Sequence, residues 1–100
     1  MGLSARILIV DDHAAVRTTI RSLLDWHSFQ VSGDARNGKE AIEKVIELKP
    51  DIVLLDINMP VMNGIQTAYE IRRIAPSTKI VFFTAHDSPQ LLSAMRVFSK

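Results

Sequence analysis

The sequence predicts an α/β domain built on a parallel sheet with helices on both faces. Short apolar runs that suit buried strands alternate with longer stretches of helical periodicity, so that a strand–helix pair recurs four times. Such alternation is typical of right-handed βαβ units, whose strands all point the same way. The carboxyl ends of these strands then share one rim of the sheet, and three of the four runs end on an acid or a hydroxyl.

The first strand is expected over Arg6–Val10, a run rich in β-branched residues that is followed by Asp11 and Asp12. A helix comes next, because apolar residues recur there at helical spacing: Val16, Ile20, Leu23 and Leu24. Asp12 is expected to cap this helix, since its charge suits the amino terminus of a helix. The helix is expected to end at Trp26-His27-Ser28.

The segment Phe29–Ala35 alternates weakly and predicts a strand near an edge of the sheet. Asn37-Gly38 would suit a hairpin turn, but a helical stripe follows it: Ala41, Ile42, Val45, Ile46 and Leu48. Asn37 is therefore expected to cap a second helix, which Pro50 stops. The apolar run Ile52–Leu55 is the third strand, and it leads directly to Asp56.

Beyond Asp56, Pro60 and Asn63-Gly64 mark a turn. The third helix is expected over Ile65–Ile74 and ends near Pro76. The fourth strand is expected over Lys79–Thr84. A fourth helix would start after Asp87 or Ser88, with its inner face lined by Leu91, Leu92, Met95 and Phe98.

Composition and net charge restrict the classes of function that this segment can have. The 100 residues suffice for one domain, spanning residues 1–100. The net charge of +1 argues against direct nucleic-acid binding by this segment, and the absence of cysteine excludes disulfides and thiolate metal sites. No apolar run is long enough to cross a membrane, and the amino terminus lacks the pattern of a signal peptide.

The polar residues at the strand ends form the candidate site. Asp11, Asp12 and Asp56 would repel one another on one rim, and a divalent cation would relieve this repulsion. Oxygen ligands without cysteine or histidine favour Mg²⁺. Asp56 would then be either a third ligand or a nucleophile toward phosphorus, the backbone carbonyl of Asn58 would face the cation, and the Thr84 hydroxyl would donate to a phosphoryl oxygen.

The alternative for each of these residues is a purely structural role. Acids that follow strands are often helix caps or solvated loop residues, and Asp12 can serve as both cap and ligand. His13 and His86 lie near the predicted rim, but a single histidine there is more often a loop residue than a base. Met59 and Met62 are expected to be packing residues.

These motifs resemble the receiver (phosphoacceptor) domain of two-component response regulators. The resemblance rests on Ile-Leu-Ile-Val-Asp-Asp-His, on Val-Leu-Leu-Asp-Ile-Asn-Met-Pro with Asn-Gly shortly after, and on Ile-Val-Phe-Phe-Thr-Ala. It covers nearly the whole chain and is closest to regulators that carry a carboxyl-terminal helix-turn-helix domain. It implies a cytoplasmic protein with a flavodoxin-like, doubly wound sheet of strand order 2-1-3-4, followed in the family by a fifth strand.

The resemblance also implies a role for each site residue. Asp56 would be phosphorylated by a histidine kinase or a phosphotransfer protein. Asp11, Asp12 and Asp56 would hold Mg²⁺ together with the backbone carbonyl of Asn58. Thr84 would be the switch hydroxyl, and the small Ala85 beside it would leave room for the phosphoryl group.

The chain departs from the family pattern near its end. Too few residues follow Thr84 for a full fifth strand and helix, so we expect the chain to stop before that unit, although Lys100 is a candidate for the family's phosphate-binding lysine. Without a fifth strand, the apolar fourth strand would be an edge, which favours a homodimer through strand four and helix four.

Two other functions remain open from the sequence. A receiver that lacks the lysine would serve as a dimerisation or interaction module that does not switch. A magnesium-dependent phosphohydrolase of the dehalogenase type also uses an aspartate at a strand end, but it needs a second acid two residues later, where this chain has Asn58. The leading hypothesis is a phosphoacceptor that promotes only its own phosphorylation and dephosphorylation.

Overall fold

Four parallel strands form a single sheet in the order β2-β1-β3-β4. The computed structural model describes residues 5–57, 59 and 63–83. Within these residues the strands are β1 (Arg6–Val10), β2 (Gln30–Ala35), β3 (Ile52–Asp56) and β4 (Lys79–Phe83). The predicted flavodoxin-like strand order is confirmed, and so is the edge position of β2.

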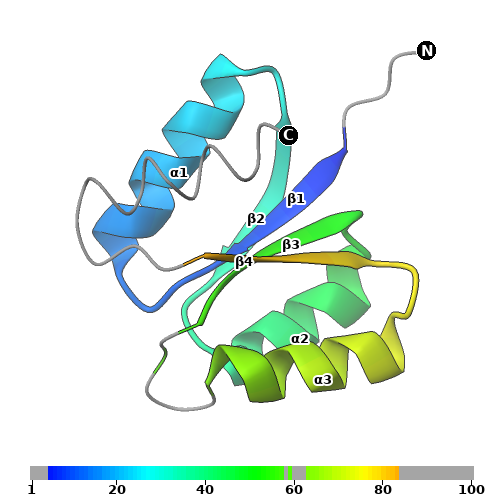
Figure 1. The fold of residues 1–100 in the computed structure, drawn as a ribbon. Helices are drawn as coiled ribbons and strands as arrows, with labels where there is room; N and C mark the ends of the chain where they lie inside the picture. Colours follow the sequence, from blue (N-terminus) through cyan, green and yellow to red (C-terminus); the bar gives the residue numbers. More distant parts are fainter. Residues whose placement is uncertain (1–4, 58, 60–62, 84–100) are drawn as a thin grey trace.

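In the described part of the chain, three helices cover the two faces of this sheet: α1 (Ala14–Trp26), α2 (Gly38–Leu48) and α3 (Gly64–Ile74). In Figure 1, α1 lies on one face, and α2 and α3 lie side by side on the other. The chain passes from β1 outward to β2 and then returns across β1 to β3. The strand order therefore reverses between β1 and β3, which is where open α/β sheets bind their ligands.

Alternate residues of the central strands supply two separate cores. Ile7 and Ile9 point toward α1 and pack in one cluster with Ile20 and Leu24. The intervening residues of the same strands face α2 and α3, and this second cluster contains Leu8, Val10, Val53, Leu55, Ala41, Val45 and Ile71. Burial on both faces explains why β1 and β3 are continuously apolar in sequence.

The amino ends of α2 and α3 are capped by asparagine side chains. The Asn37 side chain accepts a hydrogen bond from the Glu40 amide at 2.8 Å, so its predicted role as a cap is confirmed. The Asn63 side chain accepts in the same way from the Gln66 amide at 2.9 Å. The predicted Asn63-Gly64 turn is therefore also the start of α3, one residue before the expected start.

The predicted cap of α1 by Asp12 is wrong. The cap residue is His13, and its side chain makes no capping hydrogen bond. Instead, the Asp11 side chain accepts a hydrogen bond from the His13 amide at 2.7 Å. This bond spans two residues, as in an Asx turn, so it turns the chain into α1 and leaves the Asp12 carboxylate outside the capping position.

The bounds of the other elements agree with the sequence to within a few residues. Thr84 and the predicted fourth helix lie outside the described residues, as does Met62, whereas Met59 is buried as expected, with 6% of its surface exposed. Among the helices that the structure describes, none combines the length and the apolar character needed to cross a bilayer.

Candidate functional site

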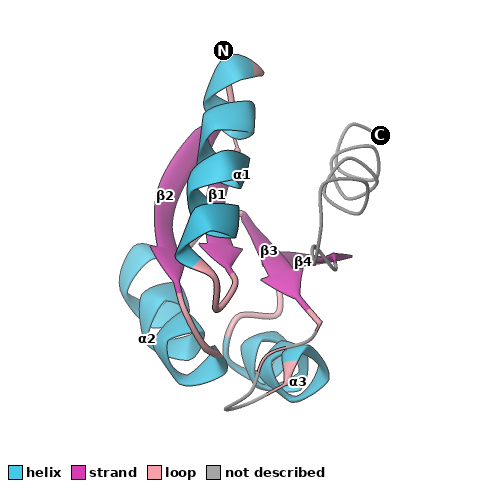
Figure 2. Cartoon of the chain, turned by 90° about the vertical axis from the view of Figure 1, so that its left-hand side faces the viewer, coloured by secondary structure: helices cyan, strands magenta, loops and turns pink. Residues whose placement is uncertain are grey.

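The candidate site lies where β1 and β3 end side by side. Val10 of β1 pairs with Leu55 of β3, so the next residues, Asp11 and Asp56, meet at the same rim. Asp56 in turn pairs with Phe83, the last residue of β4. Figure 2 views this rim end-on, with α1 beginning on one side of the sheet and α3 on the other. The predicted convergence of the acids is thus a consequence of the strand register.

The acids at this rim are removed from solvent to different degrees. Asp11 is fully buried, Asp56 is 2% exposed, and Asp12 is half-buried. One oxygen of Asp11 (Oδ2) and one of Asp12 (Oδ1) are buried without any hydrogen-bond partner. Because burying a carboxylate oxygen without a partner is costly, these two oxygens are suited to a cation.

The backbone of Asp11 is held from two directions. Its amide donates to the Ala35 carbonyl at 3.0 Å, which ties it to the end of β2. Its carbonyl accepts a hydrogen bond from Arg17 Nη1 at 2.7 Å, which ties it to the first turns of α1. Arg17 also lies near Asp34, with 3.8 Å between Nε and Oδ2. This network holds Asp11 in place although part of its carboxylate lacks a partner.

The backbone that follows Asp56 is also held by hydrogen bonds on two sides, like that of Asp11. The Ile57 amide donates to the Phe83 carbonyl at 3.0 Å, and the Ile57 carbonyl accepts from the Gly64 amide at 2.9 Å. A β-carbon at Gly64 would lie 2.5 Å from the Asp56 carbonyl oxygen, a distance that real β-carbons do not reach. The first residue of α3 must therefore be glycine for the helix to approach β3 this closely.

His13 also lies at the site, although a single histidine near a strand end is more often a loop residue. Its Nδ1 lies 3.3 Å from Asp11 Oδ1 and 3.2 Å from Asp12 Oδ1. The ligand atoms of these three residues all lie within 4.8 Å of one another, close enough to share one metal ion. The direct adjacency of the histidine to the two acids was the signal that could have identified it.

The donor set suits a hard divalent cation. Carboxylate oxygens dominate it, and Mg²⁺ binds through a few carboxylates while keeping several of its waters. Asp11 and Asp12 each present a buried oxygen without a hydrogen-bond partner. The residues at the rim therefore fit the predicted magnesium ion.

The described residues thus include Asp11, Asp12 and Asp56 at one rim, as the sequence analysis expected. Four further predicted site residues lie outside the described part of the chain: Asn58, Thr84, Ala85 and Lys100. Their roles remain predictions. His86, which was expected to have no direct role, also lies outside it.

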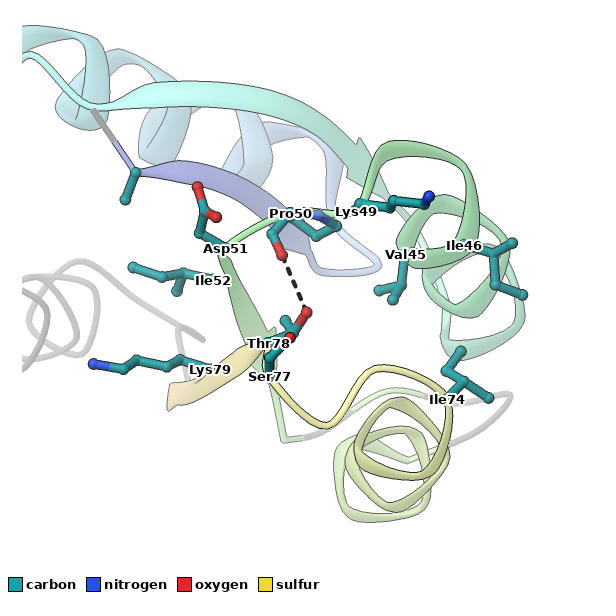
Figure 3. Close-up of a pocket in the computed structure, with 11 residues that line it drawn as sticks. Val45, Ile46, Lys49, Pro50, Asp51, Ile52, Ile74, Ser77, Thr78 and Lys79 are labelled. Carbon is teal, nitrogen blue, oxygen red and sulfur yellow. Dashed lines mark hydrogen bonds between the residues drawn. The ribbon is translucent and has the colours of Figure 1, made fainter. Parts of the chain in front are cut away.

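The opposite rim of the sheet carries a cavity of about 620 Å³ at the amino ends of β3 and β4. In Figure 3 the amines of Lys49 and Lys79 point away from each other, and the Thr78 hydroxyl is already bonded to the Pro50 carbonyl, at 3.1 Å. Asp51 accepts a hydrogen bond from the Arg6 amide at 2.8 Å. Since its polar groups diverge or have partners, this cavity lacks the convergent polar groups of a ligand site.

Comparisons with known proteins identify the family of the chain. Residues 7–97 match the response regulator receiver domain. The chemotaxis protein CheY of Thermotoga maritima is 47% identical over 83 residues, which cover 83% of this chain and 69% of CheY. A protein-glutamate methylesterase/protein-glutamine glutaminase of Methanosarcina acetivorans is 43% identical over 95 residues, which cover 92% of this chain but only 27% of that enzyme.

Solved structures of response regulators are also similar to this chain. The complex of CheX with CheY, BeF3 and Mg²⁺ from Borrelia burgdorferi superposes with a TM-score of 0.79 at 28% sequence identity. The match covers 96% of this chain and 73% of the other. The methylesterase relative is several times longer than the segment it shares with this chain, whereas CheY is mostly covered.

Proposed function

The chain belongs to the response regulator receiver domain family, whose members are phosphoacceptors in signal transduction, and from this premise we propose that Asp56 is the residue that accepts the phosphoryl group. One observation carries the proposal. Asp56 ends the strand at the reversal of strand order, beside Asp11 and Asp12, whose buried oxygens lack hydrogen-bond partners. A carboxylate next to a bound Mg²⁺ is suited to attack phosphorus.

The donor is the phosphohistidine of a histidine kinase or of a phosphotransfer protein. One Asp56 oxygen forms the new P–O bond, the P–N bond of the donor breaks, and its electron pair stays on the imidazole of the donor. Asp11, Asp12, Asp56 and the Asn58 carbonyl would hold Mg²⁺, and the ion would offset charge on the transferred group. The likeness to a CheY that is complexed with BeF3 and Mg²⁺ supports this assignment.

Phosphorylation would change the charge at one end of the sheet. A phosphoryl group on Asp56 adds about −1.5 to −2 charges near neutral pH. Thr84 directly follows Phe83, the β4 residue that pairs with Asp56. This register supports the assignment of Thr84 as the hydroxyl that moves toward the phosphoryl group, with Ala85 leaving room for it. The new charge then biases the surface between two conformations.

The reaction proposed for this segment takes place on its own carboxylate. The segment promotes its own phosphorylation and dephosphorylation, and the methylesterase activity named for the longer relative is a property of that protein. The shared segment is 27% of that enzyme's length, so this chain corresponds to only part of it.

The test is incubation of the full chain with Mg²⁺ and acetyl phosphate, followed by intact-mass analysis. We expect a single phosphoryl adduct that is lost in Asp56→Asn. The matched control is Asp51→Asn, which removes an exposed acid five residues earlier at the opposite rim and should leave the adduct in place. An adduct that persists in Asp56→Asn would rule out the assignment. No adduct on the wild-type chain would favour an interaction module that does not switch.

We also propose that a second copy of the chain pairs with β4. In the described part of the sheet β4 is an edge, and Phe82 on it is 36% exposed. Beside it, Ile65 and Tyr69 of α3 are 48% and 73% exposed, and an exposed apolar edge of this kind pairs with other chains. Light scattering after size exclusion should give a dimer, which Phe82→Lys should convert to a monomer. A wild-type monomer at tens of micromolar would contradict the pairing.

A further inference from the structure

We propose that His13 is an additional side-chain ligand beside Asp11 and Asp12 and makes the site select transition metals such as Co²⁺ and Zn²⁺ over Mg²⁺. This inference rests on the proposed metal site and concerns which ions that site takes. Oxygen ligands such as the carboxylates of this rim account for Mg²⁺, which prefers oxygen donors. An imidazole nitrogen in the same cluster changes the ligand set, because imidazole suits zinc and the later transition metals.

The distances fit one shared ion. Two atoms bound to one metal at about 2.1 Å lie about 3.0 Å apart in octahedral geometry and about 3.4 Å apart in tetrahedral geometry. His13 Nδ1 lies 3.3 Å from Asp11 Oδ1 and 3.2 Å from Asp12 Oδ1, between these two values. The separations from the ring nitrogen to both carboxylates thus suit one shared ion, and all three ligand atoms lie within 4.8 Å of one another.

Two further observations point to a ligand that is not protein. The Asp11 side chain is 1% exposed, and its Oδ2 has no hydrogen-bond partner. Asp12 Oδ1 is likewise buried without one, although His13 Nδ1 lies 3.2 Å away, so the contact between them lacks hydrogen-bond geometry. The ring and the two carboxylates thus lie close together without bonding fully to one another.

The backbone places the ring there. The His13 amide donates to Asp11 Oδ1 at 2.7 Å, which closes the turn between β1 and α1 and holds the His13 ring beside the two carboxylates. The His13 side chain is 60% exposed, so an ion can enter from solvent. The cluster therefore has buried anchoring oxygens and one accessible nitrogen.

The competing possibility is that His13 acts as a cation. A protonated ring would offset the charge of Asp11 and Asp12 and would occupy the place of the metal. The two possibilities predict opposite results for His13→Ala. Loss of a ligand weakens the binding of transition metals, whereas loss of a competing cation strengthens the binding of every divalent ion.

The experiment titrates the full chain with Mg²⁺, Co²⁺ and Zn²⁺ separately by calorimetry, and follows Co²⁺ by its visible absorption. The control variant is His27→Ala, because His27 is an exposed histidine at the far end of α1, where its Nδ1 lies 2.8 Å from the Leu23 carbonyl. The 13 residues of α1 separate the two histidines by about 20 Å.

We expect His13→Ala to weaken Co²⁺ and Zn²⁺ binding at least about tenfold, to change Mg²⁺ binding by less than about twofold, and to alter the Co²⁺ absorption spectrum. His27→Ala should change none of these. Unchanged Co²⁺ and Zn²⁺ affinity in His13→Ala, or tighter binding of all three ions, would overturn the proposal. Binding is measured directly, so failure of Asp56 phosphorylation would leave this result interpretable.

Discussion

Gly64 and Asp56 are in contact through their backbones, since a β-carbon on Gly64 would lie 2.5 Å from the Asp56 carbonyl oxygen and 2.7 Å from Ile57 Cα. Both of these neighbours are backbone atoms, so neither can rotate away as a side chain would. The contact sets the start of α3 directly against the residue proposed to carry the phosphoryl group. It links the packing of a helix to the geometry of the site.

Gly64→Ala is therefore expected to push α3 away from β3. We expect a loss of about 1–3 kcal/mol in the free energy of unfolding, which is typical of overpacking, measured by urea denaturation. Modification by acetyl phosphate should also slow, because the Gly64 amide bonds the carbonyl of the residue after Asp56.

Gly33→Ala is the matched control. The added carbon there would meet Leu48 Cδ1 at 2.8 Å, the far end of a side chain that can move. Gly33→Ala should cost less stability than Gly64→Ala and leave the phosphorylation rate unchanged. Equal effects of the two substitutions on that rate would remove the special role of the Gly64 contact.

Asp11→Asn should stabilise the metal-free fold and at the same time weaken metal binding. The amide oxygen can still accept from the His13 amide, while the uncharged amino group takes the place of Asp11 Oδ2, which has no hydrogen-bond partner. Removing one buried charge should raise the free energy of unfolding in metal-free buffer by about 1 kcal/mol. The rise in Tm that Mg²⁺ gives the wild-type chain should disappear, because that rise reflects binding to the folded state.

Thermal unfolding with and without Mg²⁺ measures both effects of Asp11→Asn. The control is Asp25→Asn, which changes an exposed acid on α1 and should affect neither quantity. If Asp11→Asn is less stable than the wild-type chain without metal, then the buried carboxylate is already compensated and the argument for an ion loses its main support.

The sheet could be predicted because its two central strands, β1 and β3, are buried on both faces. That burial makes β1 and β3 continuously apolar, and the acids that end them stand out in the sequence. Once the strands are parallel, register alone brings Asp11 and Asp56 to one rim. The overall fold and the acidic part of the site were therefore accessible from the sequence.

The cap of α1 and the position of the His13 ring could not be predicted, because both depend on which of several neighbouring polar groups forms a given hydrogen bond. Asp12 has the chemistry of a helix cap, but the Asp11 side chain bonds the His13 amide first, and α1 begins after His13. The adjacency of His13 to the two acids hints at a place in the site, but only the turn shows that its ring lies 3.2 Å from Asp12 Oδ1. Such choices among adjacent polar residues depend on backbone dihedral angles that periodicity does not report.

The two asparagine caps allow a test of how the β3–α3 segment affects the site. Asn37→Ala and Asn63→Ala each remove one bond from a side chain to a helix amide, so each should lower the free energy of unfolding by about 1 kcal/mol. Only Asn63 lies between Asp56 and α3. Asn63→Ala should therefore also slow modification by acetyl phosphate, and Asn37→Ala should not. Equal rates in the two variants would show that the start of α3 does not influence Asp56.

Arg17 is expected to position Asp11 for the metal. Its Nη1 donates to the Asp11 carbonyl at 2.7 Å, and its side chain is 18% exposed. Arg17→Ala removes this bond without removing any ligand. A hydrogen bond worth about 1 kcal/mol corresponds to about a fivefold change in affinity, so Mg²⁺ binding should weaken by about that factor.

Arg21→Ala is the control for Arg17→Ala, because Arg21 contacts the same Asp34 carboxylate, at 3.3 Å, but is not bonded to Asp11. Calorimetric titration should give wild-type Mg²⁺ affinity for Arg21→Ala and weaker affinity for Arg17→Ala. Arg17→Lys should recover only part of the loss, since an ammonium group lacks the planar fork that lets Arg17 approach both the Asp11 carbonyl and Asp34. If both alanine variants weaken Mg²⁺ binding equally, the effect comes through Asp34 and β2, and the bond to the Asp11 carbonyl is not what positions the ligand.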